Sequence, residues 1–159
     1  MTLFSSVSRY RQMEKETDIF EMAESNDTLH IQFSSYLEYI DEVCRAVTKM
    51  IESKQPQVVP HLFSINLVLR EGLTNAVRHG NKNDSDKIVD FYLTIDREKS
   101  IFLTITDQGK GFDWKTQQRE ALPEDEDHGR GIHIMETYFT RYSYNPKGNI
   151  LYLEKEISA

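Results

Sequence analysis

The chain has 159 residues, of which 38% are hydrophobic and 28% charged, and its formal net charge is −7 at pH 7. This length predicts one domain with a sizeable core, and the acidic balance argues against a direct nucleic-acid partner. No apolar run approaches the roughly 18 residues of a membrane helix, and no signal-peptide stretch opens the chain. We therefore expect a cytoplasmic protein without membrane contact, whose single cysteine, Cys44, belongs to the core.

The first third of the chain predicts a strand followed by an amphipathic helix. Residues 1–27 are mixed and charged, and we expect them to form an N-terminal arm outside the folded domain. Apolar and polar residues alternate over 28–33, which is typical of a strand with one buried face. Ser35 and Glu38 have the spacing of a capping box, and the helical spacing of apolar residues behind them predicts a helix over about 36–53.

The middle of the chain predicts a second helix and a hairpin. Apolar residues with helical spacing indicate a helix over about 60–79, and a run of turn-forming residues follows it. Two alternating apolar runs, 89–95 and 101–105, are separated by a short polar segment. This arrangement is typical of two antiparallel strands joined by a turn.

The last third predicts a helix and a strand. A long polar loop covers about 115–128, a third helix follows Gly129, and a final strand covers about 149–157. Together the elements predict an α+β fold for residues 28–159. It would be a two-layer α/β sandwich in which a mixed, mainly antiparallel sheet carries the helices on one face.

Glu71 and Asn75 are four residues apart on the second predicted helix, so they share one face. A carboxylate can accept a proton from an attacking hydroxyl. An amide oxygen is a suitable ligand for Mg²⁺, which keeps several waters when it binds beside phosphate. Taken alone, such a pair is more typical of an ordinary solvent-facing helix than of a catalytic site.

Asp107 ends a predicted strand and precedes Gly109 and Gly111. An ionised carboxylate at a strand end can accept a hydrogen bond from the exocyclic amine of a base, and glycines let the backbone approach a ligand closely. The alternative is a plain turn. A dinucleotide fingerprint is excluded, because the third glycine and the βαβ unit are both missing.

Gly129, Arg130 and Gly131 open the third predicted helix. Free backbone N–H groups and the positive end of the helix dipole favour anions there, and the arginine adds charge. A simple helix start is the alternative. Further basic candidates beside a phosphate are Arg78, His79 and Lys110.

In this order, the three segments resemble the N, G1 and G2 boxes of the GHKL ATPase superfamily, which is named for gyrase, Hsp90-type chaperones, histidine kinases and MutL. The boxes correspond to residues 71–81, 107–112 and 129–135, within a resemblance that covers about 28–157. The small size and the string from Gly129 to Glu136 are most similar to bacterial anti-sigma-factor serine/threonine-protein kinases. The resemblance implies the Bergerat ATP-binding fold, with ATP and Mg²⁺ as cofactors.

The resemblance also implies roles for individual residues. Glu71 would be the general base, Asn75 the Mg²⁺ ligand, and Asp107 the acceptor for the adenine amine. Gly109 and Gly111 would pack at the base. Gly129, Arg130 and Gly131 would belong to the phosphate-binding lid and helix. Arg78 and His79 remain further candidates for the nucleotide site on the strength of their charge alone.

One departure concerns the residues before the second glycine pair. Some sporulation-type members carry an arginine there, whereas this chain has Glu124-Asp-Glu-Asp-His128, and its nearest arginines are Arg119 and Arg130. The departure bears on the rate of phosphotransfer more than on ATP binding.

The resemblance implies an enzyme that binds a sigma factor and phosphorylates a serine of an anti-sigma-factor antagonist in a partner-switching system. It also implies a homodimer, with the helix over 37–51 or a flanking sheet edge as the contact. One alternative is a non-catalytic ATP-binding partner-switch module. Another is a detached histidine-kinase catalytic domain, against which the sequence offers no long dimerising helix with a suitably placed histidine.

Overall fold

The computed structural model describes residues 17–96, 100–113 and 127–157, with only the backbone described for 127–130. Within these residues, six strands form one sheet in the order β1-β2-β3-β4-β6-β5, and each neighbouring pair is antiparallel. The elements in chain order are β1 (Phe20–Glu24), β2 (Thr28–Ser34), α1 (Glu38–Lys54), the 3₁₀ turn η1 (Pro56–His61), α2 (Leu62–Asn75), the π turn η2 (Ala76–Gly80), β3 (Ile88–Asp96), β4 (Ser100–Thr106), α4 (Asp127–Tyr138), β5 (Arg141–Tyr144) and β6 (Ile150–Glu156).

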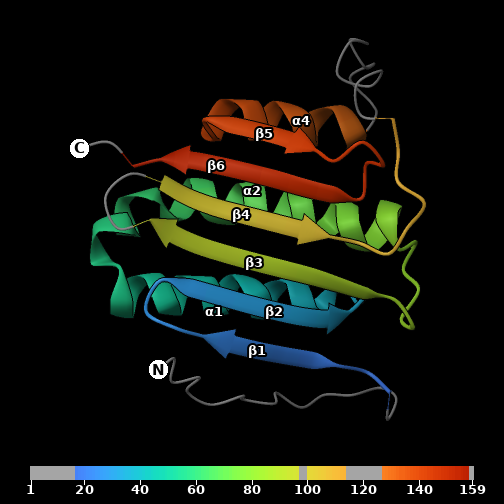
Figure 1. Cartoon of the computed structure of the whole chain (residues 1–159), viewed down its shortest axis with the longest axis horizontal. Coiled ribbons are helices and arrows are strands. Elements are labelled where there is room, and N and C mark those ends of the chain that lie inside the picture. The colour runs from blue at the N-terminus through green and yellow to red at the C-terminus, as the bar shows by residue number, and fades with distance from the viewer. Residues whose placement is uncertain (1–16, 97–99, 114–126, 158–159) are drawn as a thin grey trace.

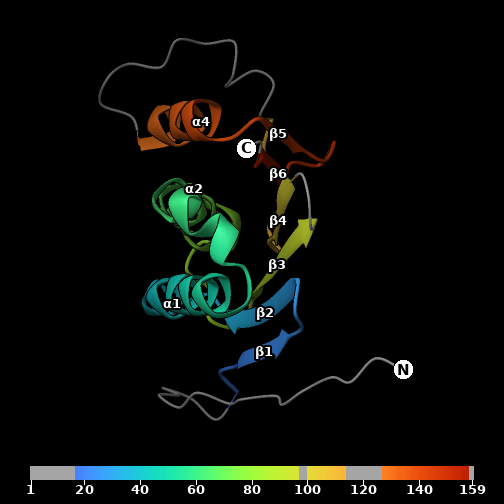
Figure 2. The ribbon, with the colours of Figure 1, turned by 90° about the vertical axis from the view of Figure 1, so that its left-hand side faces the viewer.

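The helices and the sheet form two layers. Figure 1 looks onto the sheet with α1 and α2 behind it, and Figure 2 shows α1, α2 and α4 stacked along the same side of the sheet. This arrangement confirms the predicted α+β sandwich with helices on one face. No helix within the described ranges is long and apolar enough to cross a membrane.

The core lies between the two layers, because every central strand alternates in burial. On β3, Val89, Phe91, Leu93 and Ile95 are buried, and the register places Phe91 between Ile31 of β2 and Ile105 of β4. A one-residue slip would turn these side chains to the solvent, so the alternation fixes the register. The helices close this core from one side with the following buried residues: Ile40, Val43, Cys44, Val47, Met50 and Ile51 of α1, and Ile65, Val68, Leu69 and Leu73 of α2.

Cys44 lies in this core, as the sequence predicts. It is buried on α1, and burial raises the pKa of its thiol to about 11. A neutral, shielded thiol is a packing residue rather than a nucleophile. The apolar stripe of α1 is therefore occupied within its own chain, which removes it as the contact surface of a dimer.

Strand β1 is not predicted by the sequence pattern, which places residues 20–24 in an N-terminal arm. Phe20 is nevertheless buried, with its ring centroid 5.3 Å from that of Tyr39. Burial of this aromatic ring drives pairing of a strand that has few other apolar residues. Residues 1–16 lie outside the described residues, so an arm remains a prediction for them alone.

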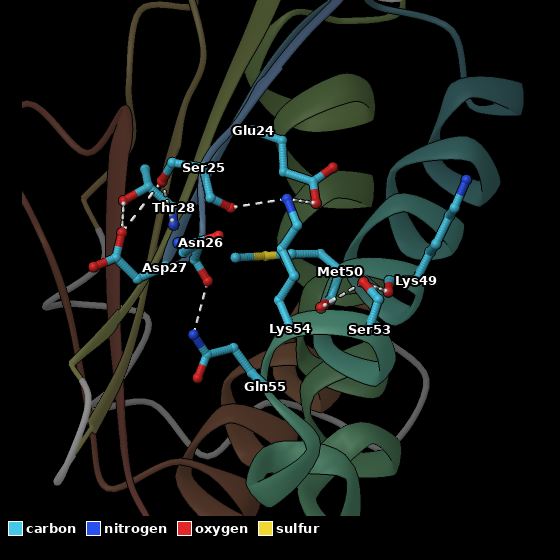
Figure 3. A network of polar contacts seen from close by, with 10 residues as sticks. All are labelled: Glu24, Ser25, Asn26, Asp27, Thr28, Lys49, Met50, Ser53, Lys54 and Gln55. Atoms are coloured by element: carbon cyan, nitrogen blue, oxygen red, sulfur yellow. Dashed lines mark hydrogen bonds and ion pairs between the residues drawn. The ribbon is translucent and has the colours of Figure 1, made fainter. Parts of the chain in front are cut away.

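The turn between β1 and β2 is tied to the end of α1 by polar contacts (Figure 3). Lys54 Nζ lies 2.7 Å from a carboxylate oxygen of Glu24 and donates to the carbonyl of Ser25 at 3.2 Å. Gln55 Nε2 donates to the carbonyl of Asn26 at 2.7 Å. These contacts fix an edge strand against the helix layer, although a partly exposed ion pair contributes little stability by itself.

The predicted capping box is wrong. The first helical residue is Glu38, the residue before it is Leu37, and no side chain caps the helix start. The Ser35 hydroxyl instead donates to the carbonyl of Lys87 and accepts from Asn81 Nδ2. Tertiary partners therefore replace the local hydrogen bond that the spacing suggests.

Other boundaries differ by a few residues. Pro56 and Pro60 form a 3₁₀ turn before α2, so the second helix begins at Leu62 and ends in a π turn at Gly80. The predicted loop over 115–128 falls largely outside the described residues, but its last two residues belong to α4. Strand β5 is also missed by the sequence pattern, because its four residues are too few to establish an alternation.

Candidate functional site

The end of α2 meets the start of α4. Glu71 and Asn75 lie on the last turns of α2, while Leu69 and Leu73 on the same helix are buried in the core. A side chain at Gly131 would place its Cβ 3.3 Å from both Glu71 Oε2 and Asn75 Nδ2. The first and third sequence motifs are therefore neighbours, with only a glycine between the carboxylate, the amide and the α4 backbone.

The π turn after Asn75 carries the chain away from α2. The backbone N–H of Asn81 donates to the carbonyl of Ala76, five residues earlier. Such wide turns are uncommon and occur frequently at functional sites. Here the turn places His79 and Gly80 at the wall of a cavity.

Asp107 lies directly after β4 and lines the same cavity, with its carboxylate next to Gly80. Its carboxylate accepts a hydrogen bond from the backbone N–H of Gly109 at 2.8 Å. Burial raises the pKa of the Asp107 carboxyl, and the Gly109 hydrogen bond and the positive charges of Lys147 and Lys87 oppose that rise. The site thus presents a half-desolvated acceptor that is suited to a hydrogen-bond donor on a ligand.

The cavity has a free volume of about 100 Å³ and opens to the solvent. It lies where the ends of α2, β4 and β5 and the start of β6 gather, at the right-hand edge of the sheet in Figure 1. Its lining residues are Gly72, Asn75, Ala76, His79, Gly80, Ile105, Asp107, Gly111, Phe112, Ile132, Tyr144, Gly148 and Leu151.

Close backbone approach explains two of the predicted glycines. Gly111 has a φ of +80°, which L residues rarely adopt, and a side chain there would collide with the carbonyl of Lys147. A Cβ at Gly109 would collide with the carbonyl of Gly80. The segment after Asp107 therefore packs against both the end of α2 and the turn before β6.

Two aromatic residues form a wall of the cavity that the motif analysis did not identify. The rings of Phe112 and Tyr144 meet edge to face with centroids 4.9 Å apart. Burial, followed by the nearby charge of Asp107, raises the pKa of the Tyr144 hydroxyl. An apolar wall beside a single acceptor fits a flat heteroaromatic base. No sequence signal near residue 144 distinguishes this tyrosine from the others of the chain.

Several predicted residues are not brought to the cavity. Arg78 is exposed and does not line it. Lys110 is exposed and borders a separate hollow with Lys147. For Gly129 and Arg130 only the backbone is described, so their place beside the phosphates stays a prediction. Both belong to α4, which begins two residues before the glycine pair, so the pair lies within the first turns of the helix.

The residues present fit a nucleotide-bound Mg²⁺ ion. Among the described residues, no group of three or more His, Cys, Asp or Glu side chains could hold a metal by itself. Mg²⁺ that bridges phosphates needs only one or two protein ligands, since water and phosphate supply the rest. Asn75 offers one amide oxygen in the cavity wall, next to Glu71.

A family model of the histidine kinase-like ATPase domain matches residues 33–155. The chain belongs to this family. Membership in an ATPase family implies that the chain binds ATP, and the matched residues include all those that line the cavity.

The chain is also similar to anti-sigma F factors of several bacteria. The chain is 31% identical to the anti-sigma F factor of Geobacillus thermodenitrificans over 137 residues, which cover 82% of this chain and 92% of that protein. It is 27% identical to the anti-sigma F factor of Priestia megaterium over the same number of residues. With that of Clostridium perfringens strain 13 it shares 31% identity over 120 residues, or 71% of this chain and 84% of that protein.

Proposed function

We propose that the protein is an anti-sigma-factor serine/threonine-protein kinase. It binds a sigma factor and uses ATP to phosphorylate a serine of an anti-sigma-factor antagonist in a partner-switching system, as the family resemblance of the sequence implies. The observation that carries this proposal is the cavity, which has Asp107 and Asn75 in its wall, together with the position of Gly131 next to both Asn75 and Glu71. The names of the relatives support the anti-sigma part.

Within this proposal, recognition of the base and chemistry occur at opposite ends of the cavity. Asp107 accepts a hydrogen bond from the exocyclic amine of adenine, and Phe112 and Tyr144 cover the ring. The phosphates then extend towards Asn75 and the start of α4, where backbone N–H groups favour anions. The γ-phosphate consequently lies next to Glu71.

The transfer step uses Glu71 as the general base. Its carboxylate takes the proton of the antagonist's serine hydroxyl as the oxygen attacks the γ-phosphorus. The bond between that phosphorus and the bridging oxygen breaks, so ADP leaves and phosphoserine forms. Asn75 would hold Mg²⁺, which when bound neutralises charge on the phosphates.

The test is transfer of labelled γ-phosphate from ATP to a small antagonist protein encoded beside this gene. We expect labelled wild-type antagonist and no label on an antagonist whose acceptor serine is changed to alanine. Glu71→Gln keeps the shape and hydrogen-bonding capacity of the side chain but removes the base, so transfer should fall about 10²- to 10⁴-fold while ATP affinity changes little.

The same experiment distinguishes the non-catalytic module. The acidic segment before Gly129 is the observation that favours this second candidate. A protein that binds ATP, binds the antagonist and transfers no phosphate would establish it. Transfer that survives Glu71→Gln within a few-fold would remove Glu71 from the role of base and leave the kinase itself intact.

The remaining parts of the proposal concern assembly and place. Binding of a sigma factor and a small antagonist places the protein in the cytoplasm. A homodimer would use a sheet edge, β1 or β5, because the apolar stripe of α1 is buried in its own core. Light scattering during gel filtration measures the mass directly, and a monomer at micromolar concentration would contradict the dimer.

A further inference from the structure

We propose that Asn81 is a positioning residue for base recognition, and that it sets the place of Asp107 by holding the neighbouring backbone. This inference rests on the proposed nucleotide function but assigns a role to a residue that never touches the nucleotide. Asn81 follows the π turn and does not line the cavity. Its relative exposure is 0%, so its polar side chain is held by specific partners.

The side chain of Asn81 connects three parts of the fold. Its Oδ1 accepts from the backbone N–H of Gln108 at 2.7 Å. Its Nδ2 donates to Ser35 Oγ at 2.8 Å and to the carbonyl of Ile88 at 3.0 Å. The acceptor oxygen therefore faces the end of β4, and the amide nitrogen faces the junctions at β2 and β3.

The contact with Gln108 is the one that reaches the binding wall. Gln108 directly follows Asp107, so the Asn81 oxygen fixes the peptide next to the recognising carboxylate. Around this peptide the packing is close, since a Cβ at Gly80 would collide with the Asp107 carboxylate and one at Gly109 with the Gly80 carbonyl. The end of α2 and the end of β4 thus touch through backbone and one buried amide.

A second hydrogen bond supports the opposite side of Asp107. Asn149 Nδ2 donates to the Asp107 carbonyl at 3.1 Å, and the Asp107 N–H donates to the Asn149 carbonyl at 3.0 Å. Asp107 is therefore held at its own peptide by Asn149, which precedes β6, and at the following peptide by Asn81. Loss of the Asn81 oxygen frees the turn that carries Gly109, whose N–H binds the carboxylate.

This geometry predicts an effect on base selectivity rather than on phosphate binding. The exocyclic amine of ATP donates a hydrogen bond to Asp107. Inosine triphosphate has a carbonyl oxygen at the same position of the base, and its phosphates are identical to those of ATP. A buried acceptor left unpaired costs about 1–3 kcal/mol, which predicts a preference of about tenfold or more for ATP in the wild-type protein. Displacement of Asp107 removes the preference while leaving the contacts of the phosphates unchanged.

The experiment compares three variants by calorimetric titration with ATP and with inosine triphosphate. Asn81→Ala should reduce the preference to within about threefold, mainly through weaker ATP binding. Asn81→Asp is isosteric and, with its buried carboxyl protonated, keeps an oxygen for Gln108 and one donor for the Ile88 carbonyl, so it should lower the melting temperature but retain the preference. Ser35→Ala removes the acceptor on the far side of Asn81 and the hydrogen bond to the Lys87 carbonyl but leaves the contact with Gln108, so it should lower the melting temperature and keep the preference.

The outcomes separate this inference from the proposed function. Asn81→Ala with an unchanged preference overturns the positioning role, as does an equal loss of preference in Ser35→Ala. A wild-type protein that binds both nucleotides equally removes base reading by Asp107 and this inference with it. If Asn81→Ala does not fold, Asn81→Leu replaces it, because leucine has a similar shape but no oxygen for Gln108. This variant should show the same loss of preference for ATP.

Discussion

Asp107 illustrates how burial tunes one residue for recognition. Its carboxylate is partly desolvated in the cavity wall, yet one backbone N–H and two lysines favour its charge. We expect Asp107→Asn to reduce the preference for ATP over GTP from about tenfold or more to a few-fold, because a carboxamide presents both a donor and an acceptor to the base. Calorimetric titration with the two nucleotides measures this preference. A variant that prefers ATP as strongly as the wild-type protein does would contradict the assignment of Asp107.

The raised pKa of Asp107 predicts a pH dependence of the same preference. The adenine amine requires the ionised carboxylate, so the ATP-to-GTP affinity ratio should rise as pH rises through the pKa of this carboxyl. The phosphates titrate alike in both nucleotides and cancel in the ratio. Asp107→Asn should flatten the profile, whereas a wild-type ratio that is constant between pH 4 and 8 would show that Asp107 does not read the base.

The same shift acts on stability with a defined sign. Burial raises the pKa of Asp107 in the folded state, so the folded protein binds this proton more tightly than the unfolded chain does. The contribution of Asp107 to stability is therefore greatest below its unfolded pKa and declines as pH rises through the folded value. Asp107→Asn lacks the titrating group, so its stability should not show this decline. Urea denaturation of both proteins over a pH series measures it: the unfolding free energy of the wild type minus that of the variant should fall as pH rises through the folded pKa.

At the scale of elements, α4 depends on a few buried anchors. Met135 is fully buried, and its Cε lies 4.0 Å from the position of a Cβ at Gly72 of α2. We expect Met135→Ala to destabilise the protein by about 2–5 kcal/mol, because a large side chain leaves a cavity between the two helices. Urea denaturation measures the change.

Thr137 provides the matched control on the same helix. It is exposed, and its hydroxyl donates to the carbonyl of His133 within α4. Thr137→Ala should change stability by no more than about 0.5 kcal/mol. Similar losses in both variants would mean that α4 does not dock through Met135.

Prediction from sequence succeeds for long periodic elements and fails for short or edge elements. β3 and β4 alternate over several residues, and α1 carries a continuous apolar stripe, so their buried faces can be read directly. β1 and β5 are edge strands of five and four residues, too short to show a clear pattern. The failed capping box at Ser35 has a similar cause, since its partners, Lys87 and Asn81, are remote in sequence.

At the scale of the whole molecule, the proposed switch requires antagonist binding to depend on the nucleotide. Only ATP presents a γ-phosphate to the start of α4, where Arg130 lies. We expect antagonist affinity to differ between the ATP and ADP states, and Arg130→Ala to reduce that difference while ATP still binds. Calorimetric titration of antagonist into protein with ATP, ADP or no nucleotide measures it, and identical affinities in the three states would exclude the switch but not the ATP site.

The sequence by itself determined the fold class, the order of the main elements and the three segments that resemble ATPase boxes. These features are local, because periodicity and motif spacing are written in neighbouring residues. Only the tertiary structure decided that Gly131 meets Glu71 and Asn75, that Phe112 and Tyr144 face the cavity, that Arg78 does not line it, and that Asn81 holds the peptide after Asp107. Contacts of this kind join residues that are distant in the chain, and their geometry depends on how strands and helices pack rather than on the pattern within any one of them.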